Sequence, residues 1–460
     1  MSELDIHSTS TGVAPQANYP GVVYWFRNDL RVHDQPALRM AVDVAQQLGV
    51  WLLPVFVHDT GLVAATRWGF TRTSARRLAW RSMALDGLSQ ALRALGSTLH
   101  ELQGASASVL TSLVQQLGGP LVVCEELPAP EERRQVQDLT SAGVNVRTVW
   151  QSTLMPRGAF PDPASVRSDQ FTPFRQALLK QGAQPAGPAP RIHQCPPVPA
   201  WQAEQALRRR QALPDPLMHT TELESLHDGW CFDMSLSAFH GSEQAALAHV
   251  TQYCQRGLPH HYKATRNGLM GADYSTKWSP WLSTGALSPR QAWAMVAAFA
   301  DQHGANEGTE WILFELLWRD YFRWLHVRHG VNLYRAGGLR HLPTPAHDPV
   351  AFQRWCQGNT GQPFIDAGMR ELAATGYLSN RMRQNVASYL IHDLQCDWRA
   401  GAAWFESQLL DFDVFSNQGN WLYLSGAGTD PRGSRRFNPL KQSDEYDPEG
   451  RYQQAWAAPD

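Results

Sequence analysis

The sequence predicts an α/β domain with a doubly wound parallel sheet, followed by an all-helical domain. Strand and helix patterns alternate over residues 20–150, as they do in parallel sheets whose strands are joined by helical crossovers. Residues 151–236 are rich in proline, glycine and glutamine, which is typical of a connector that crosses the protein surface between domains. Over residues 237–460 the apolar residues recur at helical spacing, and strand patterns almost vanish.

The first domain is expected to contain five strands separated by helices. Its first strand, Val22–Phe26, is a continuous apolar run of the kind that is buried on both faces of a parallel sheet. The further strand patterns are Trp51–Val57, Leu99–Leu102, Leu121–Cys124 and Val144–Val149. Helical patterns lie at Ala37–Ala45, Thr73–Leu95, Val109–Gln116 and Glu131–Ser141. Because no GxGxxG motif follows the first strand, a dinucleotide bound to this sheet in the Rossmann manner is not expected.

The second domain is expected to be helical throughout. Its amphipathic segments are Ser242–Arg256, Pro289–His303, Glu310–His329, Val350–Gln357, Phe364–Ala374, Asn380–Leu394 and Trp398–Leu410. Hydrophobic residues make up 43% of the chain, which is enough for two substantial cores and too many for a disordered protein. Most of the 18 tryptophans are expected in these cores, although some could stack on a cofactor or carry electrons.

Charge, cysteines and targeting signals exclude several classes of protein. The formal net charge is −2, so a polyanion such as DNA would need a local basic patch. The six cysteines are scattered and form no CxxC pair, which argues against zinc ribbons, iron–sulfur clusters and a secreted disulfide framework. Residues 1–20 lack the features of a signal or transit peptide, and no apolar run reaches membrane-spanning length. We therefore expect a soluble, cytoplasmic monomer that binds neither a membrane nor a metal ion.

Polar residues interrupt the apolar helices between residues 380 and 421. Asn380, Arg383 and Gln384 share one face of a predicted helix, and two aspartates, Asp411 and Asp413, follow. Buried polar groups need partners, so this concentration predicts a large polar ligand, and the neighbouring aromatic residues suggest that it carries a flat ring. A solvated outer face is the alternative, but such a face usually mixes lysine and glutamate. A DxD metal site would need further oxygen or histidine ligands, where the chain offers amides, so a carboxylate partner for Arg383 fits better.

Hydroxyl groups cluster just before another predicted helix. The segment Tyr274–Ser279 (YSTKWS) places serine and threonine beside Lys277. Backbone N–H groups at a helix start, together with a lysine, can hold a phosphate. An ordinary Ser or Thr N-cap before a helix that begins with proline explains the same residues, and on this segment alone it is favoured.

Five segments resemble the cryptochrome/photolyase family. They are Trp25–Arg31 (WFRNDLR), Tyr262–Leu269 (YKATRNGL), Phe314–Phe322 (FELLWRDYF), Asn380–Trp421 and Asn438–Pro448. The second and the last, with Arg383–Ser388 (RQNVAS), are similar in particular to cryptochrome DASH. The resemblance runs in order over roughly residues 20–458. It implies an α/β domain, a connector and a helical domain that encloses FAD.

The resemblance also implies which residues hold FAD. Arg383 and Asp411 match an ion pair beside the isoalloxazine ring, and Asp413 matches a residue that bonds the flavin or ribose edge. Asn417 matches the residue that faces flavin N5, where an amide suits a reduced flavin anion because it adds no charge. The complete set of matching positions is Tyr262, Ser275, Thr276, Lys277, Trp278, Ser279, Arg319, Arg383, Asp411, Asp413 and Asn417.

The implied activity is that of a deoxyribodipyrimidine photo-lyase of the cryptochrome DASH type. In this chemistry a light-excited reduced flavin lends an electron to a cyclobutane pyrimidine dimer that has left the base stack. The matching catalytic positions are Glu315, Trp318, Asn380, Tyr423 and Arg266. Tyr377 and Tyr423 stand where some relatives carry tryptophan, and the weaker stacking favours single-stranded DNA. The alternative function is a blue-light signalling photoreceptor that binds DNA without efficient repair.

One departure from the family concerns electron transfer to the flavin. Trp421 and Trp398 match the inner two tryptophans of the family's photoreduction chain, but the outermost position falls at Pro345. Either another aromatic residue ends the chain, or photoreduction is impaired. The candidates are Trp355, Trp404 and Tyr389.

Two further expectations concern an antenna and DNA. The family often holds an antenna chromophore in the α/β domain, 5,10-methenyltetrahydrofolate in most DASH members, and Glu126 is the candidate to bond its pterin ring. A solvated carboxylate at a strand end explains Glu126 equally well. DNA phosphates are expected to meet a local basic rim rather than the net charge. Its residues are Arg266, Arg381, Arg432, Arg435, Arg436 and Lys441.

Overall fold

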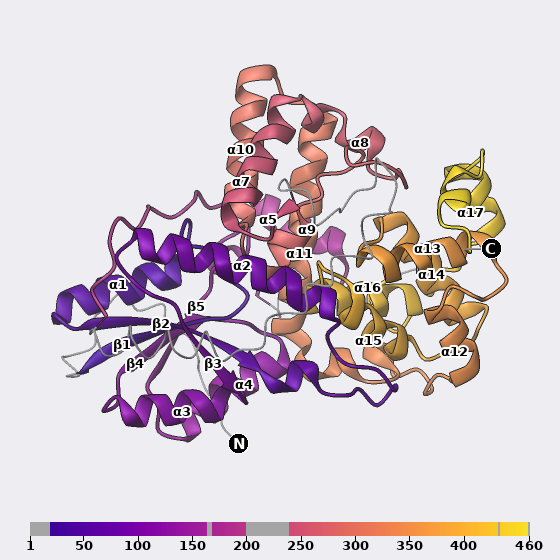
Figure 1. Ribbon diagram of the computed structural model, residues 1–460. Coiled ribbons are helices and arrows are strands. Elements are labelled where there is room, and N and C mark those ends of the chain that lie inside the picture. Colours follow the sequence, from indigo (N-terminus) through magenta and orange to yellow (C-terminus); the bar gives the residue numbers. More distant parts are fainter. Residues whose placement is uncertain (1–18, 163–167, 199–238, 431–432, 459–460) are drawn as a thin grey trace.

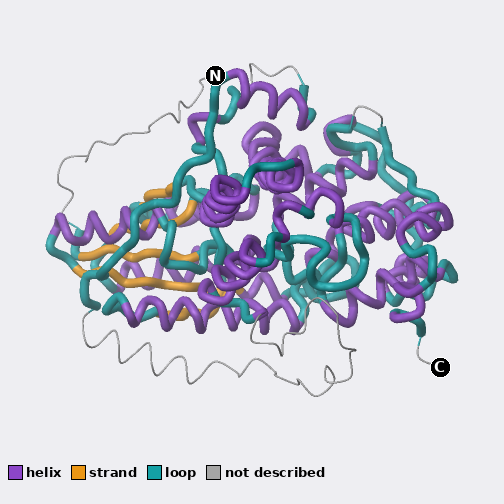
Figure 2. Tube along the Cα trace, turned by 90° about the horizontal axis from the view of Figure 1, so that it is seen from above, coloured by secondary structure: helices purple, strands orange, loops and turns teal. Residues whose placement is uncertain are grey.

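The computed structural model describes residues 19–162, 168–198, 239–430 and 433–458. Figure 1 shows a sheet domain at one end of the molecule and a larger body of helices beside it. Figure 2 shows that the strands are confined to the sheet domain. The arrangement confirms the predicted fold class. In the described parts of the chain, no helix is both long and apolar enough to cross a membrane.

Five parallel strands form the sheet, in the order β3-β2-β1-β4-β5. Their bounds are β1 Gly21–Phe26, β2 Trp51–Asp59, β3 His100–Gly104, β4 Leu121–Glu125 and β5 Val146–Val149. Because β1 lies at the centre and the chain winds outward to both edges, the sheet is doubly wound.

The central strand is buried on both faces. Val22 and Tyr24 of β1 belong to a core that includes α1 (Pro36–Leu48) and α2 (Ala75–Ala94). Val23 and Trp25 belong to a second core, with α3 (Ser106–Gln116) and α4 (Pro130–Ser141). Figure 1 shows one pair of helices on each side of the sheet. Successive strand residues point to opposite faces, so burial of both faces requires the unbroken apolar run that the sequence shows.

The helical domain contains each helix that the sequence predicts there, with ends that differ by a few residues. These helices are α7 Glu243–Gln255, α10 Pro289–His303, α11 Glu307–His329, α12 Pro349–Cys356, α13 Pro363–Thr375, α14 Asn380–His392 and α15 Trp398–Gln408. The helix beginning with proline that the sequence predicts after Ser279 is α9 Ser279–Thr284. Four more were not predicted: α8 Tyr262–Thr265, α16 Val414–Ser425, α17 Pro439–Tyr446 and α18 Arg451–Ala455. The long helix α11 packs against α8, α10 and α16 and so connects these three helices.

The predicted connector contains a helix that the sequence analysis did not foresee. Helix α5 spans Phe171–Lys180, and its apolar residues Phe171, Phe174 and Leu178 are buried. It packs against α11. The hydroxyl of Tyr321 on α11 bonds the carbonyl oxygen of Asp169, just before α5. Residues 163–167 and 199–236 of the predicted connector lie outside the described residues.

A buried polar network joins the two domains. Asp34 of the sheet domain accepts a hydrogen bond from Arg290 Nη2 at 2.9 Å and another from the Ser288 hydroxyl. Gly285 makes the closest approach: a Cβ there would lie 2.0 Å from the backbone oxygen of Asn28. A buried charge is tolerated only with a well-placed partner, so this pairing holds the two domains in one fixed arrangement.

Candidate functional site

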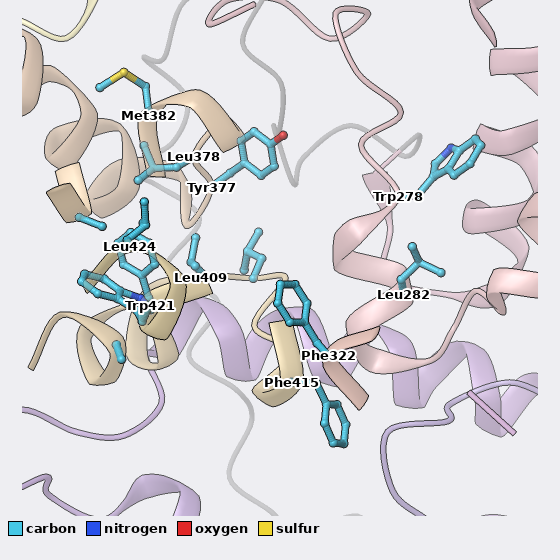
Figure 3. Close-up of a cluster of buried hydrophobic side chains, with 14 of the residues drawn as sticks. Trp278, Leu282, Phe322, Tyr377, Leu378, Met382, Leu409, Phe415, Trp421 and Leu424 are labelled. Atoms are coloured by element: carbon cyan, nitrogen blue, oxygen red, sulfur yellow. The ribbon is translucent and has the colours of Figure 1, made fainter. Parts of the chain in front are cut away.

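A cavity of about 330 Å³ opens between α11, α14, α15 and α16. Side chains from segments far apart in the sequence line it, and ten of them belong to the predicted site. These ten are Arg266, Glu315, Trp318, Asn380, Arg383, Asp411, Asp413, Asn417, Trp421 and Tyr423. Figure 3 shows buried apolar side chains of this region, with Trp278 and Leu282 on one side and Tyr377, Leu378 and Trp421 on the other.

An ion pair forms one part of the cavity wall. Arg383 Nη2 lies 2.8 Å from Asp411 Oδ2, and Arg383 Nε donates to the carbonyl oxygen of Leu378 at 2.9 Å. Burial disfavours the charged guanidinium, but Asp411 outweighs it and raises the pKa of Arg383. The other carboxylate oxygen, Asp411 Oδ1, is buried and has no hydrogen-bond partner within the described residues. It is therefore placed to accept a bond from a ligand in the cavity.

Asp413 begins helix α16 and neutralises two arginines. Its Oδ1 accepts from the backbone N–H of Ser416 at 2.8 Å, which is an N-cap, while Oδ2 lies 3.4 Å from Arg323 Nη2 and 4.0 Å from Arg319 Nη2. Burial would raise the pKa of Asp413, but the two guanidinium groups lower it below its usual value. Arg319 does not line the cavity. It donates to the carbonyl oxygen of Leu282, and burial, with Arg323 nearby, lowers its pKa to about 10.

At another part of the wall, Glu315 on α11 lies between a cation and an indole. Arg266 Nη1 is 2.8 Å from Glu315 Oε1, and the indole N–H of Trp311 donates to the same oxygen at 3.0 Å. Burial raises the pKa of Glu315, and Arg266 and Trp311 oppose this shift. Glu315 and Arg266 therefore form one polar unit, and the second oxygen of the carboxylate carries no bond from a described residue.

An aromatic wall stands next to this pair. The indole of Trp318 is stacked on Phe171 of α5, with ring centroids 4.0 Å apart and an interplanar angle of 7°. Tyr423 lies 6.3 Å from Trp318, nearly perpendicular to it, and its hydroxyl accepts a hydrogen bond from Arg435. Phe171 covers one face of Trp318, so only the other face is available to a base. The sequence analysis missed Phe171, because its segment resembled a connector.

The Tyr274–Ser279 segment does not line the cavity, but a tyrosine links Lys277 to it. Lys277 Nζ donates to the Tyr377 hydroxyl at 3.2 Å, and the Tyr377 ring lies 5.5 Å from the Arg383 guanidinium. Lys277 is 2% exposed, and no ion pair within the described residues includes it. Its φ of 56° is left-handed, a conformation that costs a non-glycine residue roughly 1–2 kcal/mol. The ring centre of Tyr274 lies 3.2 Å from Lys277 Nζ, and the buried carboxylate of Glu371 interacts with this cation electrostatically. A buried, strained cation that no carboxylate contacts directly is typical of a site that receives an anion.

The favoured interpretation of that segment from sequence was an ordinary serine or threonine N-cap. Helix α9 starts at Ser279, but its N-cap residue is Trp278, and no side chain caps it. Thr276 offers its carbonyl oxygen to His249 Nε2 at 2.9 Å. The N-cap interpretation is therefore wrong. Tyr262 is buried on α8, next to α11.

The two electron-transfer candidates occupy different environments. Trp421 lines the cavity and packs directly on α15, where a Cβ at Gly401 would lie 2.2 Å from its ring. Trp398 is buried, and its indole N–H donates to the carbonyl oxygen of Ala336 at 3.0 Å. Asn417 also lines the cavity and donates to the carbonyl oxygen of Ala402 at 3.1 Å.

The antenna candidate and the basic rim have partners that the sequence did not reveal. Glu126 forms an ion pair with Arg157 and does not line the second cavity, of about 150 Å³, between the domains. Arg381 and Arg435 line the main cavity, Arg435 also bonds Asp430, and the exposed Arg436 pairs with Asp393 at 2.7 Å. Lys441 is exposed, and Arg432 lies outside the described residues. Within the described parts of the chain, no group of three or more His, Cys, Asp or Glu side chains could hold a metal ion.

The residues present fit a flavin dinucleotide. Asp411 Oδ1 and the indole N–H of Trp278 are buried polar atoms without a hydrogen-bond partner among the described residues, which suits a ligand with donors and acceptors. Lys277 supplies a buried cation for a pyrophosphate, and Trp421 supplies a flat apolar wall for a ring system.

Comparisons with known proteins agree with this geometry. Residues 22–194 match the family model described as DNA photolyase, and residues 311–459 match the FAD binding domain of DNA photolyase. The chain is 38% identical over 447 residues to cryptochrome DASH of Synechocystis sp., covering 95% of this chain and 87% of the relative. It is also 38% identical over 447 residues to cryptochrome DASH of Xenopus laevis, covering 95% of this chain and 82% of the relative.

Two solved structures are similar in fold. The crystal structure of a Synechocystis sp. cryptochrome superposes with a TM-score of 0.84 at 36% identity, over 95% of this chain and 88% of that one. A bacterial class III photolyase from Agrobacterium tumefaciens gives a TM-score of 0.75 at 25% identity, over 98% of this chain and 88% of that one.

Proposed function

Because the chain belongs to the cryptochrome/photolyase family, and within it to cryptochrome DASH, we propose that it is a deoxyribodipyrimidine photo-lyase. It would bind FAD and use blue light to repair cyclobutane pyrimidine dimers, preferentially in single-stranded DNA. One observation carries the proposal: a single cavity joins the Glu315–Arg266 pair and Trp318 to the Arg383–Asp411 pair. A lesion and a flavin bound to these two groups would be close neighbours.

The chain's own residues bind and orient both partners. When bound, reduced FAD supplies the light-excited electron that splits the dimer and takes it back. Asp411 and Arg383 offer an acceptor and a donor to the ring edge, and Asn417 adds an amide without a net charge. Lys277 supplies a fixed positive charge for the pyrophosphate. On the other side, Trp318 stacks on a flipped base, while Asn380 and the Glu315–Arg266 pair supply polar contacts.

The preference for single strands follows from the strength of the aromatic wall. Tyr423 lines the cavity, whereas Tyr377 is buried beside Lys277 and does not line it. The stacking argument therefore depends on Tyr423. A phenol ring offers less stacking area than an indole, so less energy is available to offset the cost of flipping a paired dimer out of a duplex.

Illumination of the reduced protein tests this function directly. Dimer-containing oligonucleotides, single-stranded and duplex, are incubated with chemically reduced protein under blue light, and the loss of dimers is measured by chromatography. We expect repair of both, faster in the single strand. Flavin binding and DNA binding without any loss of dimers would contradict the proposal and favour a signalling photoreceptor. We further propose that the protein is a monomer, which size-exclusion chromatography with light scattering tests. We also propose that it is cytoplasmic, which cell fractionation tests.

Asp413→Ala is expected to lower the flavin content below one FAD per chain. The change leaves Arg319 and Arg323 without their carboxylate, and it removes the N-cap of α16, which costs about 1 kcal/mol. Asp413→Asn is the matched control, because its amide oxygen keeps the N-cap and only the charge is lost. Flavin absorbance per chain and the melting temperature are measured for both variants. An unchanged flavin content in both would show that Asp413 does not hold the cofactor.

Arg436→Gln combined with Lys441→Gln is expected to reduce the salt dependence of DNA binding. Both side chains are exposed, so their removal should not disturb the fold. Each lost phosphate contact lowers the slope of log affinity against log salt by about 0.7 for single-stranded DNA. Arg39→Gln is the control, because Figure 1 places α1 at the opposite end of the molecule from α17. Equal slopes for the double variant and the wild type would exclude these residues from the DNA interface.

A folate antenna is the second proposed cofactor, with Glu126 as a contact to its pterin ring. In the described structure Glu126 pairs with Arg157, so a pterin would have to share or replace that partner. Glu126→Ala should remove the folate absorbance from the purified protein while the FAD absorbance stays. Retention of folate by this variant would leave Glu126 as an ordinary surface carboxylate.

A further inference from the structure

With Pro345 at the outer position, the family's tryptophan chain lacks its usual exposed end. We propose that Trp68 of the α/β domain is the exposed end of an electron relay that runs from Trp421 through Trp355. The inference rests on the proposed function, because the relay would serve a flavin bound beside Trp421. It assigns a role to a residue of the sheet domain that lies far from the cavity in the sequence.

Aromatic side chains connect Trp421 to Trp68 without a break. The ring centroid of Trp421 lies 6.5 Å from that of Trp355, and Phe405 packs against both, at 5.1 Å and 6.2 Å. Trp355 lies 5.9 Å from Phe352, nearly parallel to it, at an interplanar angle of 24°. Phe352 lies 6.4 Å from Trp68. Since electron tunnelling weakens steeply with distance, a continuous path of ring contacts favours transfer over a path through aliphatic side chains.

Trp355 has the environment of a relay and not of an end point. It is fully buried, so no external reductant can reach it, and its indole N–H donates to the carbonyl oxygen of Val386 at 2.9 Å. An oxidised tryptophan that keeps its proton remains a strong oxidant and takes an electron from the next tryptophan. Trp398 is similarly enclosed, because it is buried and its N–H bonds the Ala336 carbonyl oxygen.

Trp68 has the environment of an end point. It is partly exposed, and its indole N–H bonds no side chain or backbone group of the described residues. The guanidinium of Arg67 lies 4.4 Å from the centre of its ring. A neighbouring cation disfavours a positive charge on the indole, so an oxidised Trp68 is driven to release its N–H proton to water. The resulting neutral radical does not take an electron back from Trp355, so the reverse transfer is prevented.

The other two exposed-end candidates are less well connected. Trp404 meets Phe70 at 5.0 Å, and Phe70 meets Phe352 at 6.3 Å, so two phenylalanines separate Trp404 from Trp355. A single phenylalanine separates Trp68 from Trp355. Phenylalanine is too hard to oxidise to act as a relay station itself. Each additional phenylalanine between two tryptophans therefore lengthens the distance over which the electron must tunnel. Tyr389 is partly buried and has no ring contact with another aromatic side chain of the described residues.

The electrons and protons of the relay balance as follows. Trp421 gives one electron to the light-excited oxidised flavin, Trp355 gives one to Trp421, and Trp68 gives one to Trp355. Trp68 then loses its indole proton to water. A thiol in solution restores Trp68 by giving it one electron and one proton, which leaves a thiyl radical. Two such radicals, from two turns of the relay, combine to form a disulfide.

The test measures flavin photoreduction and locates the oxidised tryptophan. Purified protein with oxidised FAD is illuminated in the presence of a thiol, and the loss of oxidised-flavin absorbance is followed. Trp68→Phe and Trp355→Phe should each lose most of the photoreduction, Trp68→Tyr should recover part of it, and Trp404→Phe should match the wild type. A second readout is peptide mass spectrometry after illumination in air without thiol. Oxygen adducts should form on Trp68 in the wild type and disappear in Trp355→Phe.

Each outcome bears on the relay or on the proposed function, but not on both. A wild-type rate in Trp68→Phe, or oxidation at Trp404 in place of Trp68, overturns the relay. A wild type that binds FAD and repairs dimers when pre-reduced, but does not photoreduce, also overturns it and leaves the proposed function intact. A chain that binds no FAD would instead refute the proposed function. Flavin content and melting temperature, measured for every variant, identify any variant whose loss comes from misfolding.

Discussion

Trp318→Ala is expected to weaken the binding of dimer-containing DNA by about 1–3 kcal/mol, roughly 5- to 150-fold, because one flipped base loses its stacking partner. The indole lines the cavity and shows one free face to it, since Phe171 covers the other. Binding is measured by fluorescence anisotropy with single-stranded oligonucleotides that carry one dimer. The undamaged oligonucleotide serves as the reference, because its bases remain outside the lesion pocket.

Phe171→Ala is the companion variant. It keeps the indole but removes the ring that fixes its plane, so the expected loss of affinity is smaller than for Trp318→Ala and appears only with damaged DNA. Glu315→Gln tests the polar part of the same pocket, because it keeps the shape of the side chain and removes the charge beside Arg266. In all three variants, photoreduction of the bound flavin should match the wild type. A Trp318→Ala variant that binds and repairs dimers normally would remove this wall from the lesion site.

The sheet domain could be predicted in detail because its signals are local. Each strand is a short apolar run. Because β1 is buried on both faces, its apolar pattern is unbroken and therefore easy to recognise. The handedness of crossover connections is nearly invariant, so the alternation of strands and helices already implied a doubly wound sheet. The strand order itself was known only from the structure.

Helix α16 could not be delimited in the same way. Its residues Asn417, Gln418 and Asn420 interrupt the apolar pattern, and the reason becomes clear only in three dimensions. Gln418 donates to the Leu333 carbonyl oxygen at 2.6 Å, and Asn417 faces the cavity. Aspartate is a favoured N-cap residue, so Asp413 marked a candidate start for the helix, although no Glu or Gln three residues later completed a capping box.

Local sequence patterns could not predict the contacts between segments that are distant in the chain. Nothing local predicts that Phe171, in a proline-rich segment, stacks on Trp318, or that Arg435 bonds Tyr423 as well as Asp430. The left-handed conformation of Lys277 also has no signal, because that region of φ is ordinarily left to glycine or asparagine. Such departures from local rules concentrate where a ligand binds, so they were the least predictable part of the site.

Trp421→Phe is expected to abolish the photoreduction of bound oxidised FAD by an external thiol, while the chemically reduced variant still repairs dimers. Trp421 is the tryptophan of the described chain that both lines the cavity and touches Trp355, so every proposed route for an incoming electron begins there. Phenylalanine preserves a flat ring against α15 at Gly401 but is much harder to oxidise. Flavin absorbance under blue light, with and without thiol, measures the first effect, and dimer repair by pre-reduced protein measures the second.

The two routes separate because they use different walls of one cavity. An electron for repair passes from the flavin to a lesion held by Trp318 and Glu315 on α11, whereas an electron for photoreduction arrives through Trp421 on α16. Trp318→Ala should therefore lose repair and keep photoreduction, and Trp421→Phe should do the opposite. Trp398→Phe distinguishes the inner routes, since photoreduction that survives it must reach Trp421 from Trp355. If pre-reduced Trp421→Phe binds FAD normally yet repairs nothing, the lesion and the relay share a path, and the assignment of separate walls is wrong.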